Sequence, residues 1–280
     1  MSKSSSSSKK PLKIRLSPPD GYPLGANRTF KVCATILIPI MKLMTAYDGR
    51  AGDKIPKNGP VIVASNHLSY LDAFALALFL YSNGRAPRFI GKIQVFRIPI
   101  IGRILLAAGQ IPVDRESKEA RVALSYALTL LEMGHQIAIY PEGTLTRDPD
   151  YWPMVAKTGA ARLAVVSKAP VYPVAQWGTQ DVIPPYSKKF KIFPRRTIRY
   201  RVGEPVDLSP WYGKEEDPVA MAEATALVMS AITDLLEEIR GQVRPKAIFD
   251  PHTSELPRTR HDTRAAKTKR RRLRRIPEET

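Results

Sequence analysis

The feature that most constrains this chain is the alternation of short apolar runs with longer helix-like stretches. Strand-like runs occupy Val61–Ser65, Arg88–Gly91, Gln110–Val113, Gln136–Tyr140, Val171–Gln176 and Thr197–Val202. Helix-like stretches cover Ser69–Leu80, a segment broken at Pro99 and Gly102, Ser117–Met133, Gly159–Val166 and Asp217–Arg240. This alternation is typical of βαβ units, and continuously apolar strands are typical of strands covered on both faces. We therefore predict the α/β class, with a mostly parallel central sheet flanked by helices.

The composition allows a substantial core and points to anionic partners. The chain has 280 residues, of which 44% are hydrophobic, and a formal net charge of +18. Such a charge attracts nucleic acid, anionic lipid headgroups or phosphorylated substrates, and does not by itself choose among them. Cys33 is the sole cysteine, so no intramolecular disulfide can form, which fits a reducing compartment.

Both ends of the chain differ in composition from its middle. Residues 1–28, which include "SKSSSSSKKP", are predicted to be a disordered basic N-terminus. Residues 244–280 are predicted to be a basic flexible tail, because Arg264–Arg275 carries eight cations and no acid. Between the two we place a helical segment over residues 29–54 and one α/β domain over residues 55–243.

The N-terminal helical segment contains the first apolar run, "VCATILIPIMKLM", over Val32–Met44. A membrane-spanning helix needs ~20 apolar residues, and Pro39 and Lys42 interrupt this shorter run. We expect a membrane-associating segment that lies in the interface or re-enters it, as one helix or two short ones. The alternative is a peripheral helix that packs on the core. No recognisable secretory signal precedes the run.

Polar residues follow four of the predicted strands, at the point where each strand ends. They are Asn66, His67 and Asp72, then Lys92, then Asp114 and Arg115, and finally Glu142, Gly143, Thr144 and Arg147. In open α/β sheets, ligands bind beyond the carboxyl ends of the strands, so these groups converge on one candidate site. Lys92 and Arg115 together would suit a phosphate, although each alone is more simply a surface charge.

The spacing of His67 and Asp72 is compatible with two interpretations. Five residues of helix turn through about 500°, so the two side chains cannot share a face if both are helical. They can meet if His67 lies in the loop before the helix and Asp72 lies in its first turns. Ser69 and Asp72 fit the signature of a capped helix start, which is the simpler interpretation. In the other, Asp72 accepts from Nδ1 of His67 and leaves Nε2 free as a general base.

The sequence contains neither a protein nucleophile nor a metal-binding pattern that we recognise. There is no G-x-S-x-G motif, and Cys33 lies in the apolar N-terminal segment. A base at His67 would therefore activate a hydroxyl group that the substrate supplies. The histidines are scattered without zinc-type spacing, at His67, His135, His252 and His261. We expect no metal site.

Four blocks, in order and at matching spacing, resemble those of the glycerolipid acyltransferases. They are "NHLSYLD", which has the N-H-x-x-x-x-D pattern, "GQIPVDR", "YPEGT" and "VYPVAQ". Four ordered blocks are far more specific than a single H-x-x-x-x-D. The resemblance covers residues 55–210 and is greatest to the bacterial 1-acylglycerol-3-phosphate, or lysophosphatidate, acyltransferases.

The resemblance implies a role for each matched residue. His67 is the implied general base for the acceptor hydroxyl, and Asp72 orients it. The acceptor oxygen would attack a fatty acyl thioester, carried by coenzyme A or acyl carrier protein, to give phosphatidate in phospholipid synthesis. Pro173, in the fourth block, is implied to lie near the acyl site. The implied substrate-binding residues are Lys92, Arg115, Glu142, Gly143, Thr144 and Arg147. No cofactor is implied, because a thioester needs orientation and oxyanion stabilisation.

The resemblance also implies a membrane partner. Residues 55–243 would be the acyltransferase catalytic domain, and both tails and Val32–Met44 would act as interfacial anchors. Each Lys or Arg near an anionic leaflet contributes about 1 kcal/mol of binding. The expected location is peripheral or monotopic on the cytoplasmic face of the cell membrane. Nucleic-acid binding is disfavoured, because the cations gather in tails and are not interleaved with aromatic residues on a sheet.

One position departs from the family pattern and leaves the acceptor open. The family usually has Arg directly after "PEGT", where this chain has Leu145. Arg147 follows two residues later as a possible replacement. Glycerol 3-phosphate or a glycolipid is therefore the alternative acceptor to lysophosphatidate. Lys157 is a further phosphate candidate, although a surface charge is the simpler interpretation.

Overall fold

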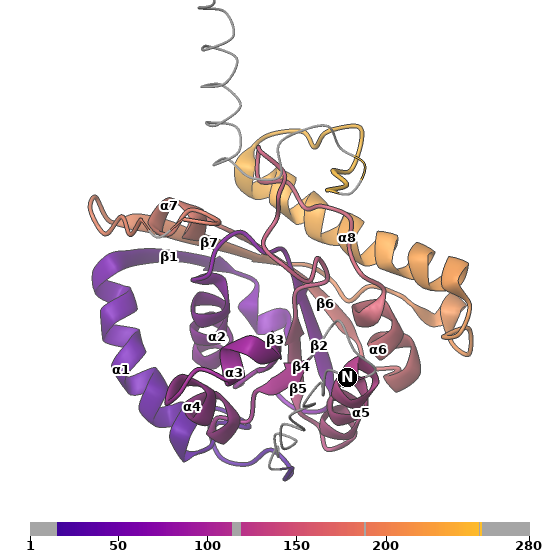
Figure 1. The fold of residues 1–280 in the computed structure, drawn as a ribbon, viewed down its shortest axis with the longest axis horizontal. Helices are drawn as coiled ribbons and strands as arrows, with labels where there is room; N and C mark the ends of the chain where they lie inside the picture. The colour runs from indigo at the N-terminus through magenta and orange to yellow at the C-terminus, as the bar shows by residue number, and fades with distance from the viewer. Residues whose placement is uncertain (1–15, 114–118, 188, 252, 254–280) are drawn as a thin grey trace, which may run out of the picture.

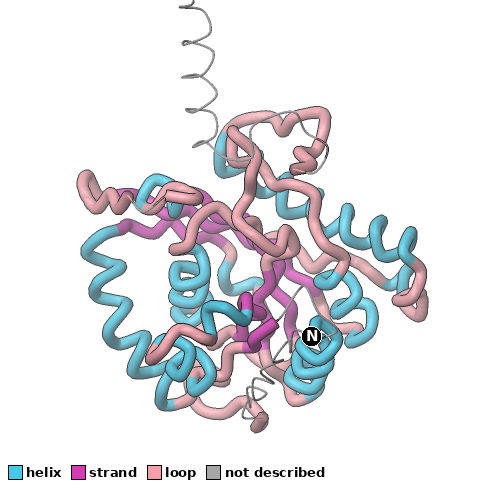
Figure 2. Tube along the Cα trace, viewed as in Figure 1, coloured by secondary structure: helices cyan, strands magenta, loops and turns pink. Residues whose placement is uncertain are grey.

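The computed structural model describes residues 16–113, 119–187, 189–251 and 253. At its centre is a seven-stranded sheet with the strand order β1-β7-β6-β2-β5-β3-β4 (Figures 1 and 2). The strands are β1 Thr45–Arg50, β2 Val61–Ser65, β3 Arg88–Lys92, β4 Ile111–Val113, β5 Gln136–Ile139, β6 Val171–Trp177 and β7 Arg196–Val202.

Five neighbouring strands of this sheet, β6, β2, β5, β3 and β4, run parallel to one another. β7 is antiparallel to β6, and β1 pairs in parallel with β7 at the outer edge. The predicted α/β class with a mostly parallel sheet is therefore confirmed. The parallel arrangement brings the carboxyl ends of the five strands to one edge, where ligands of such sheets bind.

Helices cover both faces of the sheet (Figure 1). They are α1 Arg28–Met44, α2 Asp72–Ser82, α3 Ile93–Phe96, α4 Ile101–Ala107, α5 Glu119–Glu132, α6 Gly159–Ser167, α7 Thr179–Val182 and α8 Pro218–Arg240. Alternate residues of β2 enter two different cores. Val61 and Val63 pack with α1 and α2, whereas Ile62 and Ala64 pack with α5, α6 and α8. All four are fully buried, which explains the uninterrupted apolar sequence of this strand.

The N-terminal helix α1 is continuous and passes through Pro39. The side chain of Asn27 caps it by accepting a 2.9 Å hydrogen bond from the N–H of Phe30. Its inner face packs on the domain through Phe30, Ala34, Met41 and Met44. Its outer face leaves a row of apolar side chains exposed, at Val32, Ile36, Ile40 and Leu43.

The structure differs from the prediction of a helical segment over residues 29–54. The helix ends at Met44, and Thr45–Arg50 forms the edge strand β1 instead. This strand is hard to detect in the sequence because it is short, mostly exposed and contains Gly49. A Cβ atom at that position would lie 2.6 Å from the ring of Phe79, so the close packing of β1 on α2 requires glycine.

Within the described residues, α8 is the helix that is long and apolar enough to cross a membrane by length and composition. Its apolar face is buried in the domain, where Met221, Val228 and Ile232 belong to the same core as β2. The helix begins at a cap in which Asp217 accepts from the N–H of Val219 at 2.8 Å. In this structure, α8 is therefore a core helix.

After α8 the chain turns back over the domain. The N–H of Val155 donates to the carbonyl of Phe249 at 3.0 Å, and the Phe249 side chain is buried. The first residues of the predicted 244–280 tail thus lie against the loop that precedes α6. Residues 254–280, and residues 1–15 of the predicted basic N-terminus, lie outside the described residues.

Candidate active site

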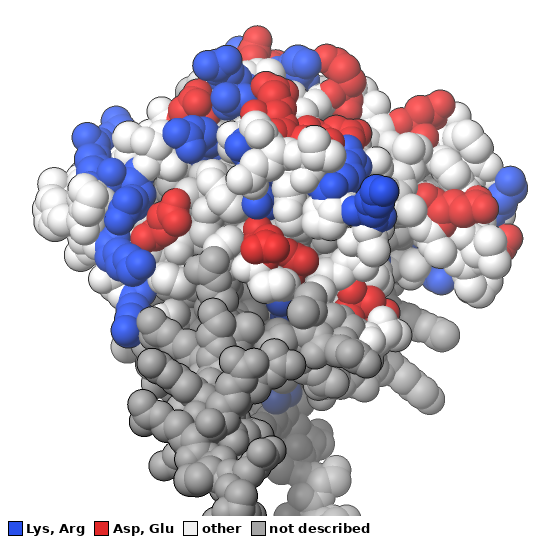
Figure 3. Space-filling model, turned by 90° about the horizontal axis from the view of Figure 1, so that it is seen from above, with Lys and Arg blue, Asp and Glu red and all other residues white. Residues whose placement is uncertain are grey.

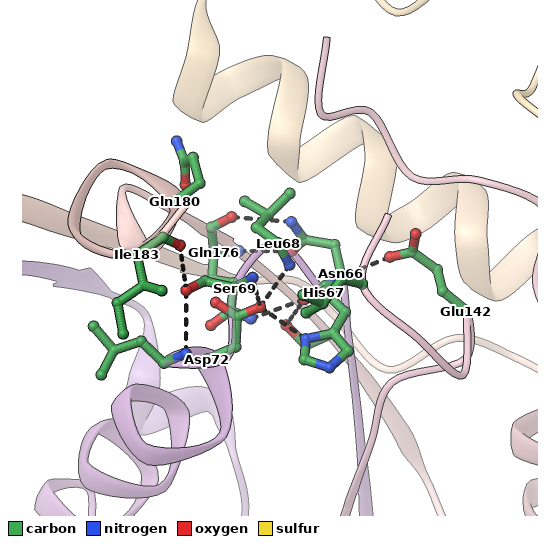
Figure 4. Close-up of polar contacts among 12 residues, drawn as sticks. Asn66, His67, Leu68, Ser69, Asp72, Glu142, Gln176, Gln180 and Ile183 are labelled. Atoms are coloured by element: carbon green, nitrogen blue, oxygen red, sulfur yellow. Dashed lines mark hydrogen bonds and ion pairs between the residues drawn. The ribbon is translucent and has the colours of Figure 1, made fainter. Parts of the chain in front are cut away.

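The candidate site lies at the carboxyl edge of the parallel strands, where β2 ends in a loop before α2 (Figure 4). His67 is in the loop, and Asp72 is the first residue of α2. Nδ1 of His67 lies 2.8 Å from Oδ2 of Asp72. Asp72 is fully buried, whereas 20% of the His67 side chain is exposed. The structure thus has the arrangement that the spacing allowed, with His67 outside the helix and Asp72 in its first turn.

The carboxylate of Asp72, the first residue of α2, also holds the loop that leads into this helix. Its Oδ2 accepts the backbone N–H groups of Leu68 at 2.5 Å and Ser69 at 2.8 Å. The hydroxyl of Ser69 donates to the carbonyl of Ile183 at 2.7 Å. The loop before α2 and the His67–Asp72 pair are therefore parts of one structure, and the N-cap position falls at Leu71, which makes no side-chain cap, instead of at Ser69. An ionised carboxylate only accepts hydrogen bonds, so Nδ1 of His67 carries the proton and Nε2 presents a lone pair.

The main chain of His67 is held on both sides by the loop that follows β5. Its N–H donates to Oε1 of Glu142 at 2.9 Å, and its carbonyl accepts from the N–H of Thr146 at 2.7 Å. The hydroxyl of Thr146 donates in turn to the carbonyl of Trp152 at 2.7 Å. Oε2 of Glu142 accepts from the N–H of Met154 at 3.2 Å. The loop 142–154 thus fixes the position of His67.

Glu142 lies behind the main chain of His67, where both of its carboxyl oxygens accept backbone N–H groups. Burial raises the pKa of Glu142 to about 8, and the bonds from His67 and Met154 oppose this rise. The negative charges of Asp72 and Asp148 also contribute to this raised value. The sequence assigned Glu142 to substrate binding, whereas the structure gives it a supporting position.

Hydrogen bonds with Gln176 hold Asn66, the residue just before His67, in place. The side chain of Asn66 donates to the Gln176 carbonyl at 3.0 Å and accepts from the Gln176 N–H at 2.9 Å. The Gln176 side chain donates to the Asn66 carbonyl at 2.8 Å. Both residues are fully buried at the ends of β2 and β6. Three hydrogen bonds therefore lock these two strand ends together.

The ring of His67 lies on the ring of Tyr140, which directly follows β5. The two ring centroids are 4.1 Å apart and the planes differ by 12°. Phe89, from β3, continues the stack, with its centroid 6.0 Å from that of Tyr140. The stack fixes one face of the imidazole, whose edge is already fixed by Asp72.

The structure places the other predicted substrate-binding residues around the same edge. Lys92 ends β3, two strands from β2, and its side chain is exposed. Gly143 has a positive φ of +73° in the turn after β5, a conformation that favours glycine. Thr144 is exposed and Arg147 is half-buried. Arg115 lies outside the described residues, so its predicted contact with phosphate remains a prediction.

The structure also describes three further positions in or near the matched blocks. The Leu145 side chain is buried, and its carbonyl accepts from the hydroxyl of Tyr186 at 2.6 Å. Lys157 is exposed, and its backbone N–H donates to the carbonyl of Pro141 at 2.9 Å. Pro173 lies in the middle of β6, away from the end of the strand that faces the site.

The arrangement is suited to proton abstraction. An imidazole whose Nδ1 is bonded to a buried carboxylate, and whose Nε2 is open, can take a proton from a hydroxyl group. Within the part of the chain that the structure describes, no group of three or more His, Cys, Asp or Glu residues is placed to hold a metal ion.

Known proteins resemble this chain in sequence and in fold. Residues 50–177 match the family model described as Acyltransferase. This part of the chain therefore resembles the acyltransferase family. The 1-acyl-sn-glycerol-3-phosphate acyltransferase of Bacillus subtilis is 25% identical to this chain over 215 residues, which are 75% of this chain and 100% of the relative. A chloroplastic protein of the same name from Brassica napus is 30% identical over 159 residues, which are 56% of this chain and 42% of the relative.

The crystal structure of the Thermotoga maritima PlsC, a 1-acyl-sn-glycerophosphate acyltransferase, shares the fold of this chain. The TM-score is 0.60, with 22% sequence identity, over 77% of this chain and 81% of that chain. The predicted resemblance to the glycerolipid acyltransferases is thus confirmed. The chain spans about half or less of several of the relatives, since it covers 42% of the Brassica napus protein and 50% of a Borreliella burgdorferi one.

Three supporting residues were not identified from the sequence. Tyr140 and Gln176 lie inside the matched blocks "YPEGT" and "VYPVAQ", so their place in those blocks was an available signal. Thr146 contacts His67 through its backbone N–H, which every residue except proline can provide. No residue type could therefore have indicated that contact.

Proposed function

We propose that this chain transfers a fatty acyl group from an acyl thioester to the free hydroxyl of lysophosphatidate. The single observation that carries the proposal is the 2.8 Å contact between His67 and the buried Asp72, inside an acyltransferase domain. The relatives with this domain are named 1-acyl-sn-glycerol-3-phosphate acyltransferases, which supports this acceptor.

In the proposed reaction, Nε2 of His67 takes the proton of the acceptor hydroxyl as its oxygen attacks the thioester carbonyl carbon. The negative charge of Asp72 stabilises the imidazolium that forms. The tetrahedral intermediate then collapses with cleavage of the C–S bond. The departing thiolate takes the proton from Nε2, so an ester and a thiol leave and the base is restored. The proposed steps need no group from outside the two substrates and the protein.

The acceptor phosphate is proposed to bind to cations at the same edge of the sheet. Lys92 ends β3 there, Arg147 lies in the loop that follows β5, and Arg115 follows β4 in the sequence. The buried Leu145 provides no charge at the position where the family usually has arginine. This observation favours a second candidate, in which the acceptor is glycerol 3-phosphate or a glycolipid.

We also propose that the protein works at an anionic membrane surface. The exposed apolar row on α1 supports this, because an exposed apolar face of a helix can bind at the bilayer interface. Seen from above in Figure 3, Lys and Arg side chains form a column on the side where α1 and α7 lie in Figure 1. Both acyl substrates and phosphate headgroups are present at such a surface.

The experiment that tests the proposal is product analysis with a panel of acceptors. Purified protein is incubated with one acyl-CoA and, separately, with lysophosphatidate, glycerol 3-phosphate and a glycolipid, and products are identified by mass spectrometry. The proposal predicts phosphatidate as the main product. A preference for glycerol 3-phosphate or the glycolipid would favour the second candidate, and no transfer to any acceptor would contradict both.

A further inference from the structure

The stacked pair of His67 and Tyr140 has a function that the His67–Asp72 contact does not supply. Asp72 fixes one edge of the imidazole through Nδ1. A single hydrogen bond leaves the ring free to tilt about the bond, which would move Nε2 relative to a substrate hydroxyl. The face-to-face contact with Tyr140, at 4.1 Å and 12°, removes this freedom. Two perpendicular constraints therefore define the plane of the ring.

Tyr140 is itself held rigidly. It directly follows β5 in the middle of the sheet, and its ring packs against the core cluster that contains α1 and α2. Phe89, from the neighbouring strand β3, also stacks with Tyr140, with an interplanar angle of 19°. The support for His67 thus comes from residues of two adjacent, hydrogen-bonded strands.

We propose that Tyr140 is a positioning residue for the general base: its ring holds the His67 imidazole in place and stabilises the imidazolium formed during proton transfer. The inference rests on the proposed role of His67 as the base. The ring face of tyrosine carries negative charge density and attracts a cation placed over it, most strongly where water is excluded. Neutral imidazole gains less, so the interaction favours the protonated state that arises in the transition state.

The aromatic face of Tyr140 acts on the protonated His67 ring separately from the titratable groups nearby. The titratable groups near His67 are Asp72 on α2, Tyr140 after β5 and Glu142 in the next turn, with Tyr200 on β7 behind Asp72. Burial and the charge of Asp72 raise the pKa of Tyr140 well above its usual value, so its ring stays a neutral phenol. The proposed role therefore belongs to the ring and not to the hydroxyl.

The test compares two substitutions of Tyr140 with a matched control in the full-length protein. Tyr140→Phe keeps the ring, whereas Tyr140→Leu keeps apolar bulk without an aromatic face. Tyr126→Leu is the control, since Tyr126 on α5 is also a half-buried tyrosine but packs against the other core cluster. Each variant is assayed for kcat and KM across pH with acyl-CoA and the best acceptor from the panel.

We expect Tyr140→Leu to lower kcat about tenfold with KM nearly unchanged. The acid limb of its pH–rate profile should move to lower pH by about half a unit, because the protonated ring has lost its support. Tyr140→Phe should keep kcat and the acid limb of the profile at the values of the unmodified protein, and Tyr126→Leu should change neither. If Tyr140→Leu behaves like Tyr126→Leu, or if Tyr140→Phe fails to restore the profile, the inference is overturned.

A measurement without substrate separates this inference from the proposed function. The ring resonances of His67 are followed by NMR across pH in the unmodified protein and in both Tyr140 variants. The inference predicts that His67 is half-protonated at a lower pH in Tyr140→Leu than in Tyr140→Phe. Equal titration in the two variants would refute the stacking role even if acyl transfer occurs. Absence of transfer to every acceptor, with this difference present, would refute the proposed reaction and leave the ring contact supported.

Discussion

At the residue scale, Asp72 joins two structures that sequence reasoning treats as alternatives. One carboxylate oxygen contacts Nδ1 of His67 and also accepts the N–H groups of Leu68 and Ser69. The same side chain therefore holds the loop before α2 and orients the proposed base. A substitution of Asp72 should damage both stability and activity, whereas one of His67 should damage activity alone.

Asp72→Ala is expected to lower the free energy of unfolding by about 1–3 kcal/mol, because two backbone N–H groups lose their acceptor. It should also lower kcat by about a hundredfold or more, because the orientation of His67 is lost. Urea unfolding and steady-state kinetics measure the two effects. Asp53→Ala, at an exposed acid of a short helical turn, serves as the control and should change neither. Loss of activity with unchanged stability would contradict the dual role.

Glu142 gives a prediction for the pH dependence of stability. Its pKa is raised from 4.5 to about 8 by burial, so the folded state binds this proton more tightly than the unfolded state. Between these values the folded state holds more protons, and the free energy of unfolding falls as pH rises. Glu142→Gln removes this dependence, although it also loses one acceptor for a backbone N–H.

The stability deficit of Glu142→Gln should therefore shrink as pH rises from about 5 to about 8 and then level off. Chemical denaturation of both proteins at several pH values measures this difference. Glu132→Gln, at the exposed end of α5, is the control and should show a constant difference. A constant deficit for Glu142→Gln would mean that the buried carboxyl does not titrate in this range.

At the scale of elements, α8 has the composition of a membrane span but the packing of a core helix. Ile232 is fully buried against the sheet, whereas Leu227 on the same helix is 41% exposed. Ile232→Ala should lower the free energy of unfolding by about 2–5 kcal/mol. Leu227→Ala should cost far less, since it leaves no cavity. Equal, small effects in guanidinium unfolding would show that α8 does not pack in the core.

The elements also show what the sequence could predict and why the rest escaped it. β2 and β6 were found because burial on both faces makes their sequences continuously apolar. β1 was missed because an exposed edge strand needs no apolar run. Its glycine, Gly49, is required by close packing against Phe79, which lies thirty residues later in the sequence. The pairing of His67 with Asp72 could be inferred because both lie within one turn-and-helix start. The contacts of Glu142 with Met154 and of Tyr140 with His67 depend on tertiary packing, so local patterns do not encode them.

At the scale of the whole molecule, the proposed membrane surface lies on the outer face of α1. Ile36 is 57% exposed there, so a charge at this position should leave the fold intact. Ile36→Asp should weaken binding to anionic vesicles about tenfold or more, because the side chain can no longer enter the interface. Vesicle flotation measures binding, and transfer assayed in detergent micelles should persist.

Val219→Asp provides the control for this prediction, because Val219 is 66% exposed at the start of α8 and lies outside the apolar row of α1. It should leave vesicle binding unchanged. If both substitutions weaken binding equally, the surface is not specific to α1. Higher salt should weaken the binding of the unmodified protein as well, since its cations then attract anionic lipid less.

The central claim, that His67 is the general base of an acyl transfer, is tested most directly by steady-state kinetics of His67→Ala. The substrates are acyl-CoA and lysophosphatidate, and circular dichroism and urea unfolding report on the fold. The account predicts a loss of about 10²–10⁴ in kcat with the free energy of unfolding nearly unchanged. Turnover in His67→Ala within a few-fold of that of the unmodified protein would contradict it.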